Sequence, residues 1–221
     1  MSNNASAQGR RINPSKTALM CVSAATSYKP IVHVKVGDVM IKGATSLKVL
    51  GLTLDSNFTF KSHVENLRNK MRRKTWALLK MKKAGLCQRD LIQSYKTLIR
   101  PVVEYVVPVW HPLITAEQAS ELERQQTQAL RNIFGPGMSA KRMRETADID
   151  SQSLRREKMC LKFANKCLNN KRCVGWFTER PPSMYARRLN TKYPRFHVPL
   201  ARTDRYRNSP KNYLRGLLNR Q

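Results

Sequence analysis

The stretch from Gln88 to Pro112 constrains the fold most, because it is the longest run of the chain that is dense in apolar and aromatic residues. Five of its apolar residues recur at helical spacing, which predicts a helix with one buried face. These residues are Leu91, Ile92, Tyr95, Leu98 and Ile99. Pro101 and Pro108 interrupt the pattern, since proline lacks a backbone donor and crowds the preceding turn. We therefore expect a buried helical segment with a kink, or a second short helix that begins near Pro101.

The net charge indicates the class of partner. The chain has 42 Lys and Arg residues against 14 Asp and Glu residues, a formal net charge of +28. A surface of this charge attracts polyanions, and a protein gains affinity for nucleic acid with each phosphate that it neutralises. Nucleic acid is therefore the expected partner. No stretch approaches the roughly 20 apolar residues of a membrane span, so no membrane is expected as a partner.

The cysteines and the N-terminus indicate the compartment. Residues 1–11 are polar and lack the apolar run of a secretory signal. The five cysteines are scattered, which favours an intracellular, reducing compartment. Within the cell, the nucleus is expected rather than the cytoplasm. Cys160, Cys167 and Cys173 lie close in sequence, but they lack a C-x2-C pair and a nearby histidine. Buried thiols are therefore favoured over a zinc site.

The first quarter of the chain predicts a small antiparallel β unit. Residues 18–23 (ALMCVS) have the pattern of a short buried strand. Residues 31–36 (IVHVKV) alternate strictly, as in a half-buried strand, and a tight turn leads from them to a hairpin partner at residues 39–43. Residues 47–54 form a further β run, which contains a glycine where a bulge or a close backbone approach would fit.

After Phe58 the apolar period becomes that of α-helices. A long helix is expected to end at Ala84-Gly85, with apolar residues of one face at spacings of three, four or seven. These residues are Phe60, Val64, Leu67, Met71 and Leu78. A second helix should run from Thr115, as its cap, to Phe134. Its inward residues are Ala119, Leu122, Gln126, Leu130 and either Ile133 or Phe134.

The last third of the chain predicts two helices and a tail. A short basic helix is expected at residues 139–147, and another helix from about Ser151. The apolar residues of the latter are Leu154, Met159 or Leu161, Phe163, Cys167 and Leu168. From Pro181 onward, basic residues, prolines and tyrosines accompany Asp204 as the one acid, which predicts an extended or disordered basic arm.

The helix after Phe58 is the strongest candidate for a nucleic-acid interface. Between Lys61 and Lys83 it has nine Lys and Arg residues and one acid, Glu65. Such a face can follow a phosphate backbone without reading bases, although a solvated face that keeps the protein soluble is the alternative. The residues expected to bind nucleic acid are Arg68, Lys70, Arg72, Arg73, Lys74, Lys80, Lys82 and Lys83. The aromatic residues Tyr105, Trp110, Trp176 and Tyr185 are each expected in the core or at its rim rather than as platforms for bases.

No catalytic constellation is visible in the sequence. Two-metal chemistry needs at least two converging carboxylates, and the nearest acid pair, Asp148 and Asp150, precedes an expected helix. Capping is the favoured role of that pair. The four histidines are spread along the chain with no motif around them, and His111 is expected to be structural. We therefore expect no catalytic residue and no metal ligand in this sequence.

Four segments, in their order and spacing, carry a resemblance. They are NPSKT at 13–17, LKVLGLTLDSNFTFKSHV at 47–64, YKTLIRPVVEYVVPVW at 95–110 and LERQQTQALRNIFG at 122–135. Together they resemble the C-terminal part of the reverse transcriptase of non-LTR (LINE-type) retrotransposons, of the jockey and CR1 kind. The resemblance implies that the first segment ends the palm, that the second is the primer-grip hairpin, and that the helical segments form the thumb.

The resemblance also implies roles for individual residues. Lys16 would lie where a palm lysine approaches the incoming triphosphate. Lys48, Leu50, Gly51 and Leu52 would lie at the primer end. The family's catalytic aspartates belong to two palm motifs that precede the NPSKT-like loop, and no residue here matches them. Magnesium is accordingly expected only for the full-length polymerase, and no cofactor is expected for this chain.

The sequence thus predicts an α+β fold that is predominantly α. A palm remnant with the primer-grip hairpin is expected at residues 1–56, a helical thumb and its extension at 57–180, and a basic flexible tail at 181–221. The expected function is that of a polymerase fragment that holds template and primer, as RNA, DNA or a hybrid, without polymerising alone. The missing polymerase portion is a second expected partner. The alternatives are a stand-alone basic RNA- or DNA-binding protein and an interaction module that oligomerises through the stretch at residues 88–112.

Overall fold

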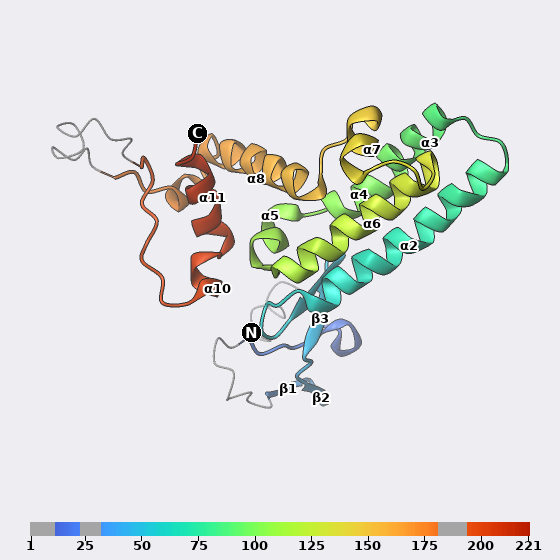
Figure 1. The fold of residues 1–221 in the computed structure, drawn as a ribbon. Helices are drawn as coiled ribbons and strands as arrows, with labels where there is room; N and C mark the ends of the chain where they lie inside the picture. Colours follow the sequence, from blue (N-terminus) through green and yellow to red (C-terminus); the bar gives the residue numbers. More distant parts are fainter. Residues whose placement is uncertain (1–11, 23–31, 181–193) are drawn as a thin grey trace, which may run out of the picture. The chain divides into compact units, whose positions relative to one another are not determined.

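The computed structural model describes residues 12–22, 32–180 and 194–221, and the chain divides into two compact units, Met1–His63 and Val64–Gln221. The described residues are mostly helical and include two small antiparallel β-hairpins (Figure 1). This confirms the predicted fold class. None of the described helices is long and apolar enough to cross a membrane.

The first hairpin joins β1 (His33–Val36) to β2 (Val39–Lys42), with Val36 opposite Val39. Gly37 takes a positive φ of 63° in the connecting turn, as a tight hairpin requires. The hairpin was predicted, and of the three valines on one side of the predicted half-buried strand, Val32 and Val36 are half-buried whereas Val34 is 42% exposed. A two-stranded sheet buries a face only where another layer covers it.

The second hairpin lies in the β run at residues 47–54. β3 (Ser46–Val49) pairs with β4 (Leu52–Asp55), and Leu50 and Gly51 form the turn. Both turn residues have positive φ, 48° and 86°, which matches a type I′ turn. The glycine is therefore a turn residue rather than a bulge, and the segment is a hairpin, as the family resemblance implied.

The strand predicted at residues 18–23 does not form in its described part. Leu19 makes an isolated parallel bridge with Gly43, and Val22 is exposed. Upstream of it, the short 3-10 helix η1 (Pro14–Lys16) begins after Asn13, whose side chain accepts from the backbone N–H of Ser15 at 3.0 Å. This local hydrogen bond holds the turn without a strand partner.

Asp55 ends the second hairpin and shapes the entry to α2 (Lys61–Lys83). Its carboxylate accepts hydrogen bonds from the backbone N–H groups of Asn57 at 3.1 Å, Thr59 at 2.9 Å and Phe60 at 2.7 Å. Phe60 has a positive φ of 55°, a conformation that is unfavourable for a bulky residue. The three hydrogen bonds to Asp55 hold the chain in this conformation just before the helix begins.

α2 and α6 (Ala116–Phe134) lie side by side in the second unit and run in the same direction (Figure 1). Glu121 near the start of α6 binds Arg68, and Asn132 near its end donates to the carbonyl of Thr75 at 3.4 Å. The predicted inward residues of α2 are all buried: Phe60, Val64, Leu67, Met71 and Leu78. The predicted cap of α6 is also confirmed, because Thr115 and Gln118 form a reciprocal capping box.

The segment between these helices is built from short pieces: α3 (Gln88–Ser94), the π-helical turn η2 (Tyr95–Ile99), α4 (Arg100–Glu104), α5 (Val107–Trp110) and the 3-10 turn η3 (His111–Leu113). The predicted interruptions at the prolines are confirmed. In η2 the N–H of Arg100 bonds to the carbonyl of Tyr95, five residues earlier. Val106, just before α5, has a left-handed φ of 51°.

The π turn explains which residues of this segment are buried. The buried residues recur every four positions: Leu91, Tyr95, Ile99, Val103 and Val107. A repeat of four exceeds the 3.6 residues of an α-helical turn, and the wider π turn absorbs the difference. Leu98, expected in the core, is therefore 42% exposed.

α7 (Ala140–Ala147) and α8 (Gln152–Leu168) begin after the cap residues Ser139 and Ser151. The helix expected from about Ser151 is confirmed, although two of the apolar residues that predicted it, Leu154 and Phe163, are exposed. The buried residues of α8 are Gln152, Arg156, Cys160, Ala164 and Cys167. Small residues allow close packing against α5 and α11 (Pro210–Leu218), while Gln152 hydrogen-bonds to Tyr95 and Arg156 hydrogen-bonds to His111.

The predicted disordered tail is wrong for its last part. After η4 (Val174–Trp176), the described chain continues through α10 (Asp204–Arg207) to α11, which packs on α8 and α5. Leu214, Leu217 and Leu218 are buried. Their helical spacing is inconspicuous in a strongly basic region, yet it suffices for an amphipathic helix. Residues 181–193 of the predicted tail lie outside the described residues.

Candidate nucleic-acid interface

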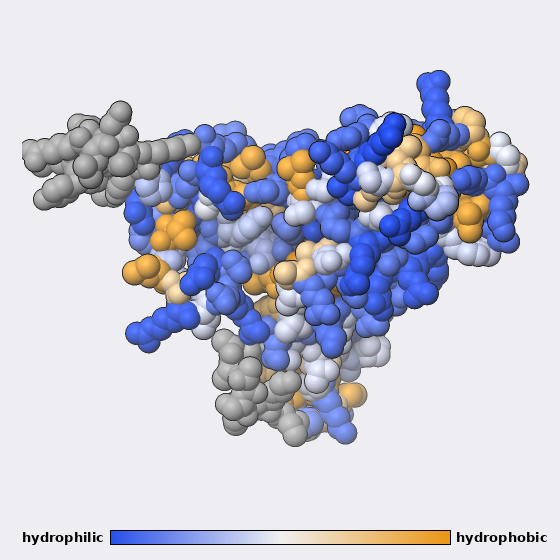
Figure 2. All heavy atoms as spheres, in the orientation of Figure 1, coloured by the Kyte–Doolittle hydropathy of each residue, from blue (hydrophilic) through white to orange (hydrophobic). Residues whose placement is uncertain are grey.

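The outer face of α2 is strongly basic. Its exposed cations are Lys61, Lys70, Arg72, Arg73, Lys80 and Lys83, whereas Lys74 is half-buried. Glu65 is the one acid in the helix. Figure 2 shows that hydrophilic side chains cover much of the surface over α2. A rigid helix with this face can hold several cations against one phosphate backbone.

Two of the cations predicted to bind nucleic acid contact α6 instead of standing free. Arg68 lies 3.3 Å from Glu121 and 3.6 Å from Glu65. The Nζ of Lys82 donates to the carbonyls of Asn132 and Ile133, both at 2.9 Å. Those carbonyls belong to the last turn of α6, where a cation complements the negative end of the helix dipole. Arg68 and Lys82 therefore hold α2 against α6.

The remaining predicted site residues lie in the first unit. Lys16 is exposed at the end of η1, and Lys48 is exposed on β3. Of the three primer-grip residues, Leu50 is 87% exposed and Gly51 is exposed at the hairpin turn, whereas Leu52 is 7% exposed. The hairpin thus presents the turn residues and buries the leucine that follows them.

Trp76 is a candidate binding residue that the sequence reasoning missed. It is 62% exposed on the outer face of α2, and the Nζ of Lys80 lies 4.9 Å from its ring centroid. Arg72 and Arg73 precede it by one helical turn. The signal was available in the sequence, because cations at positions −4, −3 and +4 lie on the same side of a helix as the residue between them.

The aromatic residues that were predicted to lie in the core or at its rim differ from Trp76 in their placement. Trp110 is fully buried, and its indole N–H donates to the carbonyl of Tyr105 at 2.9 Å, which confirms its place in the core. Tyr105 is 50% exposed and Trp176 is 40% exposed, as expected for residues at the rim. Tyr185 lies outside the described residues.

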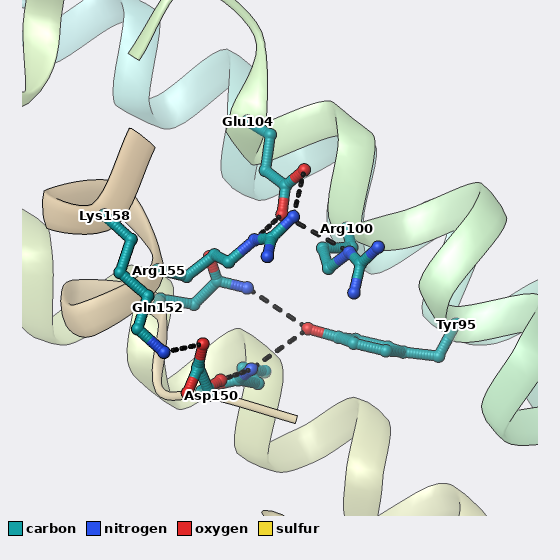
Figure 3. A network of polar contacts seen from close by, with 8 residues as sticks. Tyr95, Arg100, Glu104, Asp150, Gln152, Arg155 and Lys158 are labelled. Atoms are coloured by element: carbon teal, nitrogen blue, oxygen red, sulfur yellow. Dashed lines mark hydrogen bonds and ion pairs between the residues drawn. The ribbon is translucent and has the colours of Figure 1, made fainter. Parts of the chain in front are cut away.

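A polar network ties α3–η2, α6 and the start of α8 together (Figure 3). The Tyr95 hydroxyl accepts hydrogen bonds from the side-chain amides of Gln126 at 3.2 Å and Gln152 at 3.1 Å. The Gln126 amide also donates to the carbonyl of Asp150 at 3.0 Å. Burial raises the pKa of the Tyr95 hydroxyl above its usual value. The hydroxyl therefore stays neutral and acts as a structural acceptor.

This network borders a pocket of about 620 Å³ whose lining includes six Lys and Arg residues. Four of these cations are paired with carboxylates. Glu104 binds Arg100 at 3.3 Å and Arg155 at 2.6 Å. Lys158 binds Asp150 at 2.7 Å, and Lys96 lies 3.9 Å from Asp148. Most of the positive charge that lines the pocket is therefore balanced by neighbouring carboxylates.

In the described part of the chain, the acidic and cysteine side chains that were considered for chemistry have structural roles. Asp148 caps the end of α7 with a φ of 51°, and Asp150 forms its ion pair with Lys158, so the acid pair is structural. Cys160 and Cys167 are buried free thiols, as expected. Within residues 12–22, 32–180 and 194–221, no group of three His, Cys, Asp or Glu side chains is placed to hold a metal ion.

Comparisons with known proteins give a distant relative. No family model matches the chain, and no solved structure matches it. A probable RNA-directed DNA polymerase from transposon X-element of Drosophila melanogaster is 29% identical over 103 residues. The match covers 45% of this chain and 11% of the length of that protein. This similarity relates the chain to the RNA-directed DNA polymerase of a transposon.

Proposed function

We propose that this chain is a nucleic-acid-binding part of a non-LTR retrotransposon reverse transcriptase, corresponding to the end of the palm, the primer grip and the thumb. The observation that carries the proposal is the exposed basic face of α2, a helix whose sequence contains nine cations and one acid. The similarity to a transposon polymerase supports it. In this proposal, template and primer are held here, and polymerisation depends on catalytic residues outside this sequence.

The way α2 is anchored suits this role. Asp55 fixes the backbone that enters the helix, while Arg68 and Lys82 attach the helix to α6. The helix can therefore present Arg72, Arg73 and Lys80 in a fixed register. Contacts of this kind position a strand or a duplex without sequence preference, because they reach phosphates rather than base edges.

The central test is the salt dependence of binding. The Arg72→Ala/Arg73→Ala/Lys74→Ala triple variant should bind RNA, DNA and hybrid more weakly, irrespective of their sequences. Its slope of log affinity against log salt should be shallower by up to about three phosphate contacts. The matched control removes the same charge from exposed positions elsewhere in the second unit, with Lys162→Ala/Lys166→Ala/Arg172→Ala.

The two triple variants give a clear decision. The proposal predicts that the α2 variant changes the slope markedly and that the control changes it little. An unchanged slope in the α2 variant, or equal losses in both variants, would remove α2 from the interface. A second assay tests whether the chain binds nucleic acid without polymerising it. The purified chain, given a primed RNA template and magnesium, should not extend the primer. Extension without an added polymerase would refute that part of the proposal.

A further inference from the structure

The basic face of α2 has an indole near its middle. Trp76 is 62% exposed, and Arg72, Arg73 and Lys80 lie one helical turn before or after it. Lys80 already contacts the ring, with its ammonium 4.9 Å from the centroid. An aromatic face and several phosphate-binding cations are therefore presented side by side on one rigid helix.

Its position distinguishes Trp76 from an ordinary exposed apolar residue. Single exposed apolar residues are common and need no explanation. The inner face of α2 is formed by Leu67, Met71 and Leu78, so Trp76 lies away from the core that the helix buries. Its neighbours on the outer face are cations. Aromatic side chains set among cations are the combination by which proteins bind single strands, since bases stack on the rings while phosphates pair with the charges.

We infer that Trp76 stacks on an unpaired base of a single-stranded nucleic acid, with Arg72, Arg73 and Lys80 on the adjacent phosphates. The inference rests on the proposed function and adds the strand state of the ligand. In a continuous duplex each base is covered on both faces by its neighbours, so an indole on a helix surface has no base face to contact. An unpaired base has an exposed face, so no neighbouring base must be displaced before the indole can stack on it. Trp76 should therefore favour single strands, whereas the cations bind both forms.

The test compares substitutions of Trp76 that keep the charge of α2 unchanged. Trp76→Leu keeps apolar bulk and removes the aromatic face, and Trp76→Phe keeps an aromatic ring. The ligands are an unstructured oligouridylate and a blunt RNA duplex of equal length, at one salt concentration. Trp76→Leu should weaken binding of the single strand about 5- to 100-fold and leave duplex binding within about 2-fold. Trp76→Phe should keep most of the affinity.

Fluorescence provides a direct readout of the contact. Oligouridylate should quench the emission of the wild-type protein and should quench the Trp76→Phe variant much less. Trp110, which is fully buried, and Trp176, which is 40% exposed, are present in both proteins, so their shared emission is the background against which the signal of Trp76 is measured. Since Trp76 is exposed, its replacement should not unfold the chain, and the unfolding midpoint of each variant checks this.

The outcomes separate this inference from the proposed function. If the α2 triple variant loses binding and Trp76→Leu binds the single strand normally, the stacking inference is wrong and the proposed function stands. If Trp76→Leu weakens single strand and duplex equally, the preference for unpaired bases is wrong. If the α2 triple variant binds nucleic acid like the wild type, the proposed function itself fails.

Discussion

Arg156 donates from Nε to Nδ1 of His111 across 3.2 Å, although Arg156 is fully buried. Because Nδ1 accepts this hydrogen bond, the proton of the neutral imidazole lies on Nε2, which faces the hydroxyl of Tyr213 at 3.3 Å. Arg156 also lies over the ring of Trp110, at 6.0 Å from its centroid. The cluster joins α5–η3, α8 and α11, which makes His111 structural, as expected from the sequence.

This cluster predicts a pH dependence of stability. Burial, and secondarily the charge of Arg156, lowers the pKa of His111 from 6.5 to about 4. Between these values the unfolded chain binds a proton that the folded chain does not, so the free energy of unfolding falls as the pH decreases from 6.5 through 4. The contribution lost is at most about 3 kcal/mol. Thermal unfolding at pH steps from 7 to 4 measures it.

His111→Gln is the control for this pH dependence. Glutamine can accept from Arg156 and donate to Tyr213, but it does not titrate. The difference in unfolding free energy between the two proteins should therefore shift in favour of the variant as the pH falls below 6.5. A constant difference from pH 7 to 4 would mean that His111 does not titrate in this way.

The Tyr95 hydroxyl should contribute measurably to stability. Tyr95→Phe leaves the buried amides of Gln126 and Gln152 without their shared acceptor. We expect a loss of about 1–3 kcal/mol in the free energy of unfolding, measured with urea. Tyr206→Phe, at a residue that is 51% exposed, should change stability by less than about 0.5 kcal/mol. Equal effects of the two substitutions would contradict a special role for the network.

Asp55 should hold the entry to α2 through its three backbone hydrogen bonds. Asp55→Ala removes them, at an expected cost of about 1–2 kcal/mol, comparable to loss of a helix cap. Asp55→Asn keeps one acceptor oxygen and should cost less. Amide hydrogen exchange at Asn57, Thr59 and Phe60 should accelerate more in the alanine variant than in the asparagine variant. Unchanged exchange at all three amides would rule out this role.

Lys82 and Lys83 are adjacent cations with different expected roles. Lys82→Met keeps the apolar stem and removes the charge from the end of α6, which should cost about 1 kcal/mol of unfolding free energy. Lys83→Met should leave stability within about 0.5 kcal/mol. In nucleic-acid binding the order should reverse, with Lys83→Met the weaker binder. The same order in both measurements would contradict the separation of roles.

The sequence predicted elements whose determinants are local. The buried face of α2 follows from apolar residues at helical spacing, and the start of α6 follows from Thr115 and Gln118, which are three positions apart. The basic character of α2 could be counted directly. Trp76 needed only the same helical arithmetic applied to its basic neighbours, so this residue was predictable although it was overlooked.

The sequence predicted burial wrongly where contacts between residues far apart in the sequence determine it. The inward face of α8 contains Arg156 and Gln152, whose partners His111 and Tyr95 are 45 and 57 positions away. The apolar residues of α8 alone therefore indicate a different buried face from the one observed. The exposure of Leu98 was also not predictable. It depends on the π turn, and a helical pattern assumes 3.6 residues per turn throughout.

The parallel run of α2 and α6 has a consequence for the order of folding. Contacts between these helices join residues 50 to 57 positions apart, as in the pairs Arg68–Glu121 and Thr75–Asn132. Two helices that point the same way cannot close as a short hairpin, so the chain must first return through α3, α4 and α5. Long-range closure is slow compared with local pairing. The segment from α3 to α6 should therefore assemble early, and α2 should dock late onto a surface that has already formed.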